Sequence, residues 1–228
     1  MGKVIIVEGI IGAGKTTFSK LLAESLGGNW LKEPDEQNGN PYLSKFYETP
    51  TRWALTMQLH LLNTRFRMHK YAQWTALQSN KCVVLDRSYF GDTAFARLQL
   101  QNKTMTLDEY QTYTMSYHNM TSSVLLPQIC VYLKTSPEVS QQRIKTRMEH
   151  QTGRKCEDVI DLKYLQDLDV EEDLVIDTLK KQGVYIIHID WNDNLSFECI
   201  QSKVDEVCKT INEYTVPDVL LDLHRRTV

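Results

Sequence analysis

The stretch VIIVEGIIGAGKTTF, residues 4–18, decides how the chain folds. It opens with four β-branched residues, 4–7, which are typical of a buried parallel strand. The motif G-x-x-x-x-G-K-[ST] follows at residues 9–16, and a helical pattern of apolar residues comes directly after it. A plain glycine turn is the alternative, but a strand, a glycine-rich loop and a helix in this order predict a phosphate-binding loop.

Each residue type in this loop has a physical role. Glycines accept positive φ angles and let backbone N–H groups converge on a phosphate. The helix N-terminus adds partial positive charge, Lys15 can reach the outer phosphates, and the Thr16 hydroxyl can bind Mg²⁺. We therefore expect ATP and Mg²⁺ as ligands. The residues expected to contact ATP here are Gly9, Ile10, Ile11, Gly12, Ala13, Gly14, Lys15, Thr16 and Thr17.

Length and composition limit the class of protein. A chain of 228 residues with 42% apolar content suits one large α/β domain. The net charge of −3 calls for no nucleic acid, and five cysteines without a C-x-x-C pair favour reduced thiols. The first strand leaves no room for a signal peptide, and no apolar run reaches the ~20 residues of a membrane helix. We expect a cytoplasmic protein with no nucleic-acid or membrane partner.

Strand and helix patterns alternate along the chain. Further strands are expected at 29–32, 82–85, 128–134 and 184–189. Helices are expected at about 41–48, 52–77, 91–101, 107–124, from 137 onward, 162–181 and 197–214. This alternation predicts an α/β fold with one doubly wound, five-stranded parallel sheet flanked by helices. We expect a single domain over 1–213 and a C-terminal tail over 214–228.

Polar side chains follow two of the expected strands. Glu33 precedes Pro34, which cannot continue a central strand, so Glu33 lies at a strand's carboxyl end. Asp86 and Arg87 follow the strand at 82–85, and Asp86 stands where a Walker B carboxylate would. Open α/β sheets bind ligands at the carboxyl ends of their strands. We therefore expect these side chains beside the phosphate-binding loop, with Asp86 supporting the metal.

An arginine-rich segment late in the chain indicates a kinase lid. Arg143 and Arg147 lie four apart on one expected helix, and Arg154 follows in a polar stretch. Such a segment, at about 147–158, suits a lid over a transferring phosphoryl group. Excluding water matters when the acceptor is a hydroxyl, because hydrolysis competes. A solvated basic helix face is the alternative.

Taken together and in order, these residues resemble a deoxyribonucleoside kinase of the deoxycytidine/deoxyguanosine/deoxyadenosine kinase type. The resemblance runs from Lys3 to about Ile211, and its Glu-Pro, Tyr-Glu-x-Pro-x-Arg-Trp and Asp-Arg-Ser motifs are specific at these spacings. It implies a P-loop kinase fold and transfer of the ATP γ-phosphate to the 5′-hydroxyl of a deoxynucleoside, in nucleotide salvage. Besides the glycine loop and the arginine lid, the matching stretches are 31–34, 47–53, 57–58, 63–66, 86–88, 91–92, 156–157, 162–165 and 189–192.

The resemblance also implies the catalytic residues. Glu33 is similar to the general base that takes the proton of the sugar 5′-hydroxyl. Arg87 is similar to the arginine that holds the 5′-oxygen region and the base in place. The remaining cations resemble those that stabilise the transferring phosphoryl group. The catalytic set is therefore expected to be Glu33, Arg87, Lys15, Arg143 and Arg147.

The donor side is expected to extend beyond the glycine loop. Arg147 and Arg154 resemble lid arginines that contact ATP. Asp190, Trp191 and Asn192 are similar to the loop around the donor's base. Thr16 and Asp86 are the expected Mg²⁺ residues.

The acceptor side is expected to bind the sugar and the nucleobase. Tyr47 and Glu157 are similar to the pair that holds the sugar 3′-hydroxyl, and Gln58 to the amide that binds the base edge. Arg65 and Asp92 resemble a charged pair that marks deoxycytidine- and purine-type kinases, whereas thymidine-preferring members carry apolar residues there. We therefore expect deoxyadenosine, deoxyguanosine or deoxycytidine over thymidine. A merely structural ion pair is the alternative.

A homodimer is also expected from the resemblance, because the family is usually dimeric through two long helices. The expected helices at 52–77 and 107–124 carry apolar residues beyond the need of one face, namely Met115, Met120 and Leu125.

Two other functions compete with this interpretation. A nucleoside monophosphate kinase such as thymidylate kinase shares the loop, the Asp-Arg pair and the arginine lid. In such an enzyme Glu33 would repel the substrate phosphate. A nucleotide-binding scaffold with an inert loop is the second alternative, and the intact Lys15, Thr16, Glu33 and Asp86 argue against it.

Overall fold

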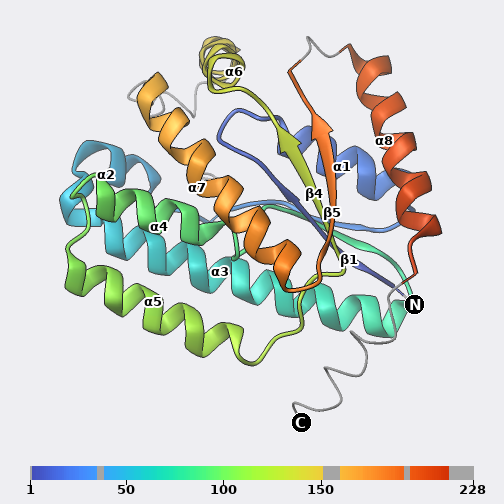
Figure 1. Ribbon diagram of the computed structural model, residues 1–228, viewed down its shortest axis with the longest axis horizontal. Coiled ribbons are helices and arrows are strands. Elements are labelled where there is room, and N and C mark those ends of the chain that lie inside the picture. The colour runs from blue at the N-terminus through green and yellow to red at the C-terminus, as the bar shows by residue number, and fades with distance from the viewer. Residues whose placement is uncertain (1, 35–38, 151–159, 193–195, 216–228) are drawn as a thin grey trace.

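The computed structural model of the chain describes residues 2–34, 39–150, 160–192 and 196–215 (Figure 1). Its strands form one all-parallel sheet in the order β2-β3-β1-β4-β5. The predicted doubly wound, five-stranded parallel sheet is therefore confirmed. The strands are β1 (Val4–Glu8), β2 (Asn29–Leu31), β3 (Val83–Asp86), β4 (Ile129–Lys134) and β5 (Tyr185–Asp190).

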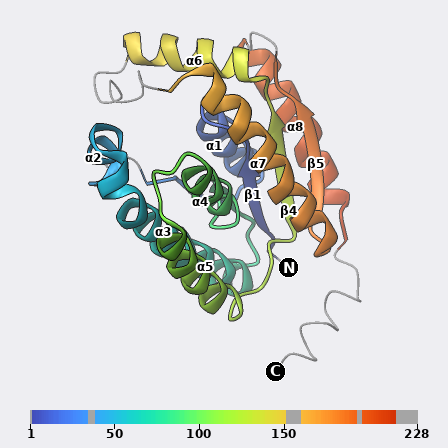
Figure 2. The ribbon, with the colours of Figure 1, turned by 60° about the vertical axis from the view of Figure 1, so that its left-hand side comes forward.

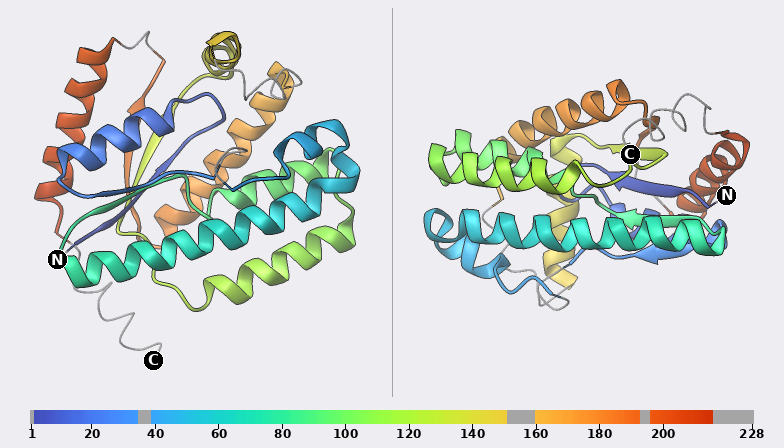
Figure 3. Two further views of the ribbon diagram at one scale, coloured as in Figure 1. Left: turned by 180° about the vertical axis from the view of Figure 1, so that it is seen from behind. Right: turned by 90° about the horizontal axis from the view of Figure 1, so that it is seen from below.

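Helices cover both faces of the sheet. α1 and α8 pack together on one face (Figure 3, left panel), and α4 and α7 pack together on the other (Figure 1). α5 lies against α3 and α4 on the outside (Figure 3, right panel). The helices of the described residues are α1 (Lys15–Ser25), α2 (Leu43–Glu48), α3 (Pro50–Ser79), α4 (Asp92–Gln101), α5 (Leu107–Thr121), α6 (Pro137–His150), α7 (Leu162–Lys181) and α8 (Phe197–Glu213). None of them is long and apolar enough to cross a membrane.

The register of the sheet brings the strand ends to one edge. β1 and β3 are buried along their whole length, as expected for central strands covered on both faces. Val7 pairs with Asp86, and Leu31 pairs with Leu85. Because all strands run in the same direction, Glu8, Glu33 and Asp86 all lie where a strand ends. The phosphate-binding loop, which leaves β1 after Glu8, begins at the same edge.

α6 packs directly on the phosphate-binding loop. Figure 2 shows this helix lying across the end of the sheet. Gly12 has a φ of 84°, and a Cβ added there would lie 2.6 Å from the Ser140 carbonyl oxygen and 2.9 Å from Ile144 Cγ1. Two separate reasons thus favour glycine at this position, the positive φ of the backbone and the close approach of α6. The predicted start of the arginine-rich helix is therefore fixed against the loop that it is expected to serve.

Two of the predicted boundaries concern parts of the chain that the structure does not describe. Residues 151–158 of the expected lid, 147–158, lie outside the described residues. The expected tail, 214–228, is described only at Tyr214 and Thr215, and Tyr214 stacks on Tyr185 with ring centroids 4.6 Å apart. The division into a domain at 1–213 and a tail stays a prediction.

Replacing Gly12 by alanine should destabilise the protein more than the same change at Gly27. Both glycines have positive φ, 84° and 59°, but nothing lies within 4 Å of a Cβ at Gly27. The backbone strain costs about 1–2 kcal/mol at either site, and the contact with α6 adds about 1–3 kcal/mol at Gly12 alone. Urea unfolding of the two variants measures the difference. Equal losses would mean that α6 does not press on the loop.

Candidate active site

Lys15 lies inside the curve of the phosphate-binding loop. Its Nζ donates to the carbonyl oxygens of Gly9 and Ile10, each at 2.9 Å. Burial and the nearby charge of Arg87 together lower the pKa of Lys15 to about 8, although the neighbouring carboxylates oppose this shift. The ammonium group is still mostly charged at neutral pH, so it can meet phosphate oxygens. Of the other predicted loop residues, three are buried, two are half-buried and three are exposed; these are Gly9, Ile10 and Ala13, then Ile11 and Gly12, then Gly14, Thr16 and Thr17.

Thr16 and Asp86, the two residues expected to bind Mg²⁺, are in direct contact. The Thr16 hydroxyl donates to Asp86 Oδ2 at 2.7 Å. Asp86 Oδ1 is buried and has no hydrogen-bond partner among the described residues. Within those residues, no group of three His, Cys, Asp or Glu side chains could hold a metal by itself. The pair therefore fits Mg²⁺, which keeps several waters and takes most remaining ligands from phosphates.

Arg87 connects the loop to Glu33. It has a φ of 66°, which is uncommon for a residue with a side chain. Its Nη2 donates to the Gly9 carbonyl oxygen at 2.9 Å, and its Nε lies 3.2 Å from Glu33 Oε1. Its guanidinium also lies over the Phe95 ring, 4.8 Å from the centroid. The predicted neighbours Glu33 and Arg87 are therefore in contact beside the loop.

Arg65 bridges Glu33 and Asp92. Its Nη2 donates to Glu33 Oε1 and its Nη1 to Asp92 Oδ1. Burial raises the pKa of Glu33, but the charges of Arg65, Arg87 and Lys15 together outweigh it and hold that pKa at about 2. Glu33 is therefore ionised at neutral pH. The predicted Arg65–Asp92 pair is present, and it also reaches the residue expected to be the base.

Gln58 is already engaged within the protein. Its Nε2 donates to the Asp92 carbonyl oxygen, and its Oε1 accepts from Gln99 Nε2, both at 3.0 Å. An amide has two N–H donors and two acceptor lone pairs, so these two bonds use half of its capacity. Gln99 and Asp92 hold the Gln58 amide in one orientation, and the side chain is 0% exposed. Its contact with a nucleobase edge stays a prediction.

The expected donor residues gather beside the loop. Arg143, on α6, donates to the Trp191 carbonyl oxygen at 2.9 Å and to the Ala13 carbonyl oxygen at 3.4 Å. A Cβ added at Gly14 would lie 3.2 Å from Trp191 Nε1. Asn192 donates from Nδ2 to Asp190 Oδ1 at 2.7 Å and accepts from the Ser136 N–H at 2.7 Å. The segment after β5 thus borders the phosphate-binding loop.

Four further residues are predicted for the sugar site and the lid, and the structure describes two of them. Tyr47 lies half-buried on α2, and the centroids of its ring and the Phe46 ring are 5.4 Å apart. Arg147 lies half-buried on α6, one turn after Arg143. Arg154 and Glu157 lie outside the described residues, and so does the predicted Tyr47–Glu157 pair.

Sequence reasoning missed four polar residues of this site. Tyr113 donates to Asp92 Oδ2 at 3.0 Å, and Gln99 holds Gln58. Glu8 and Glu172 lie buried behind Arg87. A signal existed for both carboxylates, because Glu8 ends a buried strand and Glu172 interrupts the apolar face of α7. Tyr113 and Gln99 carry no comparable signal, since their pattern is that of ordinary helix residues.

Comparisons with known proteins show the family of the chain. The family model described as deoxynucleoside kinase matches residues 5–215. A deoxyguanosine kinase of Dictyostelium discoideum is 35% identical over 191 residues, which are 84% of this chain and 65% of that relative. A deoxyadenosine/deoxycytidine kinase of Bacillus subtilis (strain 168) is 30% identical over 217 residues, 92% of this chain and 94% of that relative.

A solved structure shares the fold over nearly the whole chain. It is a deoxyadenosine kinase from M. mycoides with products dCMP and a flexible dCDP bound. The TM-score is 0.73 at 26% identity, and the match covers 92% of this chain and all of that one, 100%. These relatives are named as kinases of deoxynucleosides. The comparisons therefore support neither of the two alternatives, a thymidylate kinase or an inert scaffold. The chain belongs to the deoxynucleoside kinase family.

Proposed function

We propose that the protein transfers the γ-phosphate of ATP to the 5′-hydroxyl of a deoxynucleoside, with a purine deoxynucleoside or deoxycytidine preferred over thymidine. The observation that carries this proposal is the contact of Glu33 with Arg87 beside the phosphate-binding loop, at 3.2 Å. A carboxylate there can meet a hydroxyl, whereas it would repel a substrate that already carries a phosphate.

Glu33 orients and deprotonates the acceptor hydroxyl in this proposal. Its low pKa keeps it ionised, so it accepts the hydroxyl proton through a charge-assisted hydrogen bond. A strong base is not required, because phosphoryl transfer passes through a loose transition state in which positioning matters most. Arg87 and Arg65 hold the carboxylate from two sides and leave it little freedom.

The donor phosphates lie against the loop and the first turn of α1. Lys15 and Arg143 contribute positive charge where the transferring group passes, which stabilises the transition state. Thr16 and Asp86 would hold Mg²⁺, which would neutralise negative charge on the phosphates. Arg147 and Arg154 complete the donor side from α6 and the stretch that follows it.

Arg65 and Asp92 select the nucleobase. Both are almost fully buried, 4% and 0% exposed, and Arg65 Nε has no hydrogen-bond partner among the described residues, so a base that does not bond with it leaves a buried donor unpaired. Tyr113 and Gln58 fix Asp92 through its carboxylate and its backbone. Thymine carries a methyl group that would meet this charged pair. The relatives are named as kinases of deoxyguanosine and of deoxyadenosine and deoxycytidine, and these names support the same preference.

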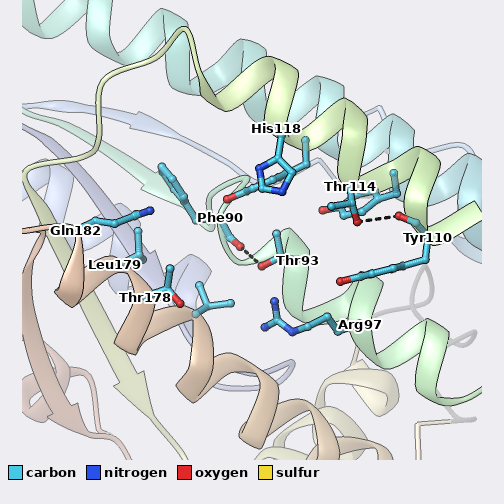
Figure 4. A pocket seen from close by; sticks show the side chains of 12 residues that line it. Phe90, Thr93, Arg97, Tyr110, Thr114, His118, Thr178, Leu179 and Gln182 are labelled. Carbon is cyan, nitrogen blue, oxygen red and sulfur yellow. Dashed lines mark hydrogen bonds between the residues drawn. The ribbon is translucent and has the colours of Figure 1, made fainter. Parts of the chain in front are cut away.

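Self-association through α7 is also proposed. Val170 and Leu174 lie one turn apart on this helix and are 61% and 50% exposed. The turns that follow them line a pocket of about 190 Å³ between α4, α5 and α7 (Figure 4), which a second copy could fill. Of the residues named from the sequence, Met115 is 62% exposed and Leu125 is 38% exposed, while Met120 packs against the core. α3 also carries exposed apolar side chains, namely Tyr71, Trp74 and Leu77. The α7 face is proposed because it adjoins the pocket, and the test below compares it with α3.

The change Glu33→Gln should lower kcat by ~10²–10⁴ while ATP–Mg²⁺ binding stays nearly unchanged, because the proton acceptor is lost and no residue proposed to contact ATP or Mg²⁺ is altered. Steady-state kinetics with saturating deoxynucleoside measures kcat, and titration calorimetry measures ATP binding. Glu24→Gln is the matched control, since that side chain is 60% exposed and pairs with Lys20 on the surface of α1. A Glu33→Gln protein with full kcat would remove Glu33 as the base.

A panel of acceptors with ATP–Mg²⁺ should rank deoxyadenosine, deoxyguanosine or deoxycytidine above thymidine and show no turnover of dTMP. In the double variant Arg65→Met/Asp92→Ala, the kcat/KM ratio of thymidine to deoxyadenosine should rise about 10-fold or more, because room for a methyl group opens. A ratio is used because Arg65 also holds Glu33. Arg67→Met, on the exposed side of α3, is the control. Fastest turnover of thymidine by the unchanged protein would contradict the preference.

The double variant Val170→Asp/Leu174→Asp should be monomeric where the unchanged protein is dimeric, because two charges would be buried at the interface. Light scattering after size-exclusion chromatography at micromolar concentration measures the mass. Trp74→Asp, at a side chain 61% exposed on α3, should stay dimeric. A dimer that survives both charges on α7 would move the interface elsewhere, and a monomeric unchanged protein would end the proposal.

A further inference from the structure

Two carboxylates lie buried behind the predicted active site, and the reaction described above uses neither. Glu8 ends β1 and Glu172 lies on α7, and the side chains of both are 0% exposed. Glu8 accepts from the backbone N–H of Ser88 at 2.8 Å and from its hydroxyl at 2.5 Å. Glu172 contacts the site itself. Buried carboxylates are costly unless a specific arrangement retains them.

Glu172 closes a ring with the phosphate-binding loop and Arg87. Its Oε1 accepts from the Gly9 N–H at 3.1 Å and from Arg87 Nη1 at 3.2 Å. Arg87 Nη2 in turn donates to the Gly9 carbonyl oxygen at 2.9 Å. Both backbone polar groups of Gly9, the first loop residue, are therefore fixed by this one carboxylate and one guanidinium.

The same guanidinium also fixes the acceptor side. Arg87 Nε lies 3.2 Å from Glu33 Oε1, whereas its Nη1 bonds Glu172 Oε1. An unbroken chain of contacts thus runs from Gly9 through Glu172 and Arg87 to Glu33. A shift of Glu172 would therefore move the phosphate-binding loop relative to Glu33, the proposed general base.

We propose that Glu172 is a positioning residue, which holds the phosphate-binding loop and Arg87 in one fixed geometry so that donor phosphate and acceptor hydroxyl are aligned. This inference rests on the proposed function, since alignment matters only if the site transfers a phosphoryl group. Glu172 touches neither donor nor acceptor in this scheme. It acts through Gly9 and Arg87, and transfer rates fall steeply when reacting groups are misplaced by even ~1 Å.

The charge balance of the cluster supports the proposal. Burial raises the pKa of Glu172, and the charges of Arg87 and Lys15 oppose that rise. Burial and the charge of Glu172 raise the pKa of Glu8 to about 7, against the pull of Arg87. Oε2 of Glu8 and Oε2 of Glu172 both have no hydrogen-bond partner among the described residues. The two carboxylates differ in their Oε1 partners, because Glu172 bonds Gly9 and Arg87 whereas Glu8 bonds Ser88 and lies 3.7 Å from Arg87 Nη1. Of these two, Glu172 is thus the one that Arg87 bonds directly.

The neighbouring Glu171 offers a matched control. It lies on the same helix, is 5% exposed, and pairs with Arg97 Nε at 2.5 Å and with Gln101 Nε2 at 2.5 Å. These partners belong to α4 and not to the active site. Loss of Glu171 therefore removes a charge of similar burial and a similar set of bonds without touching Gly9 or Arg87.

The experiment compares Glu172→Gln with Glu171→Gln in kinetics and in thermal unfolding. In Glu172→Gln the amide oxygen of the new side chain can still accept from Gly9, but the charge opposite Arg87 is gone. Glu172→Gln should lower kcat about 10- to 100-fold with the KM values for ATP and deoxynucleoside changed less than about 3-fold. Glu171→Gln should lose stability with kcat unchanged. A Glu172→Gln protein that loses only stability and retains kcat would overturn the proposal.

Two further measurements keep the test decisive. If Glu172→Gln does not fold, Glu172→Asp keeps the charge but withdraws it by one methylene, and the same fall in kcat is expected of it. A double-mutant cycle with Arg87→Lys should give effects on kcat that are far from additive, because Glu172 acts through Arg87. Additive effects would overturn the proposal. An unchanged protein that phosphorylates no deoxynucleoside would instead refute the proposed function.

Discussion

A single buried guanidinium organises the candidate active site. Arg87 follows β3, is 2% exposed, and contacts the Gly9 carbonyl, Glu33 and Glu172. Its positive φ of 66° shows that the backbone accepts strain to bring it there. Three elements that are distant in sequence, the loop after β1, the end of β2 and the middle of α7, are tied together by this one side chain. The relation between donor and acceptor depends on it.

The cost of burying so many charges explains why the site is built as a network. Four carboxylates, Glu8, Glu33, Asp86 and Glu172, surround Lys15 and Arg87 in a largely buried space. Each unpaired charge would cost several kcal/mol, at about the scale of the protein's whole stability. The pairing lowers that cost, and the raised pKa of Arg87 reflects the surrounding negative charge acting against its burial. The same pairing holds the side chains of the candidate site in defined positions.

Arg65 links the proposed base-recognition site to the proposed general base. It bonds Glu33 with one nitrogen and Asp92 with the other, so the residue proposed to read the nucleobase also holds the proposed general base. A nucleobase that disturbs the Arg65–Asp92 pair would therefore disturb Glu33 as well. Specificity of this kind acts on the rate of transfer in addition to binding. Tyr113 and Gln58, which fix Asp92, extend the same coupling to α5 and α3.

The sequence by itself determined the sheet, the phosphate-binding loop and the residues at the strand ends. These features are local, because strand, glycine turn and helix are set by patterns of a few residues, and parallel strands must end at one edge. Gly9, Lys15, Glu33, Asp86 and Arg87 could thus be found in order along the chain. Only the tertiary structure decided that Glu172 meets Gly9 and Arg87, across separations of 163 and 85 residues. Contacts of that kind depend on how α7 packs against the sheet, and no local pattern encodes the packing of one buried side chain on another.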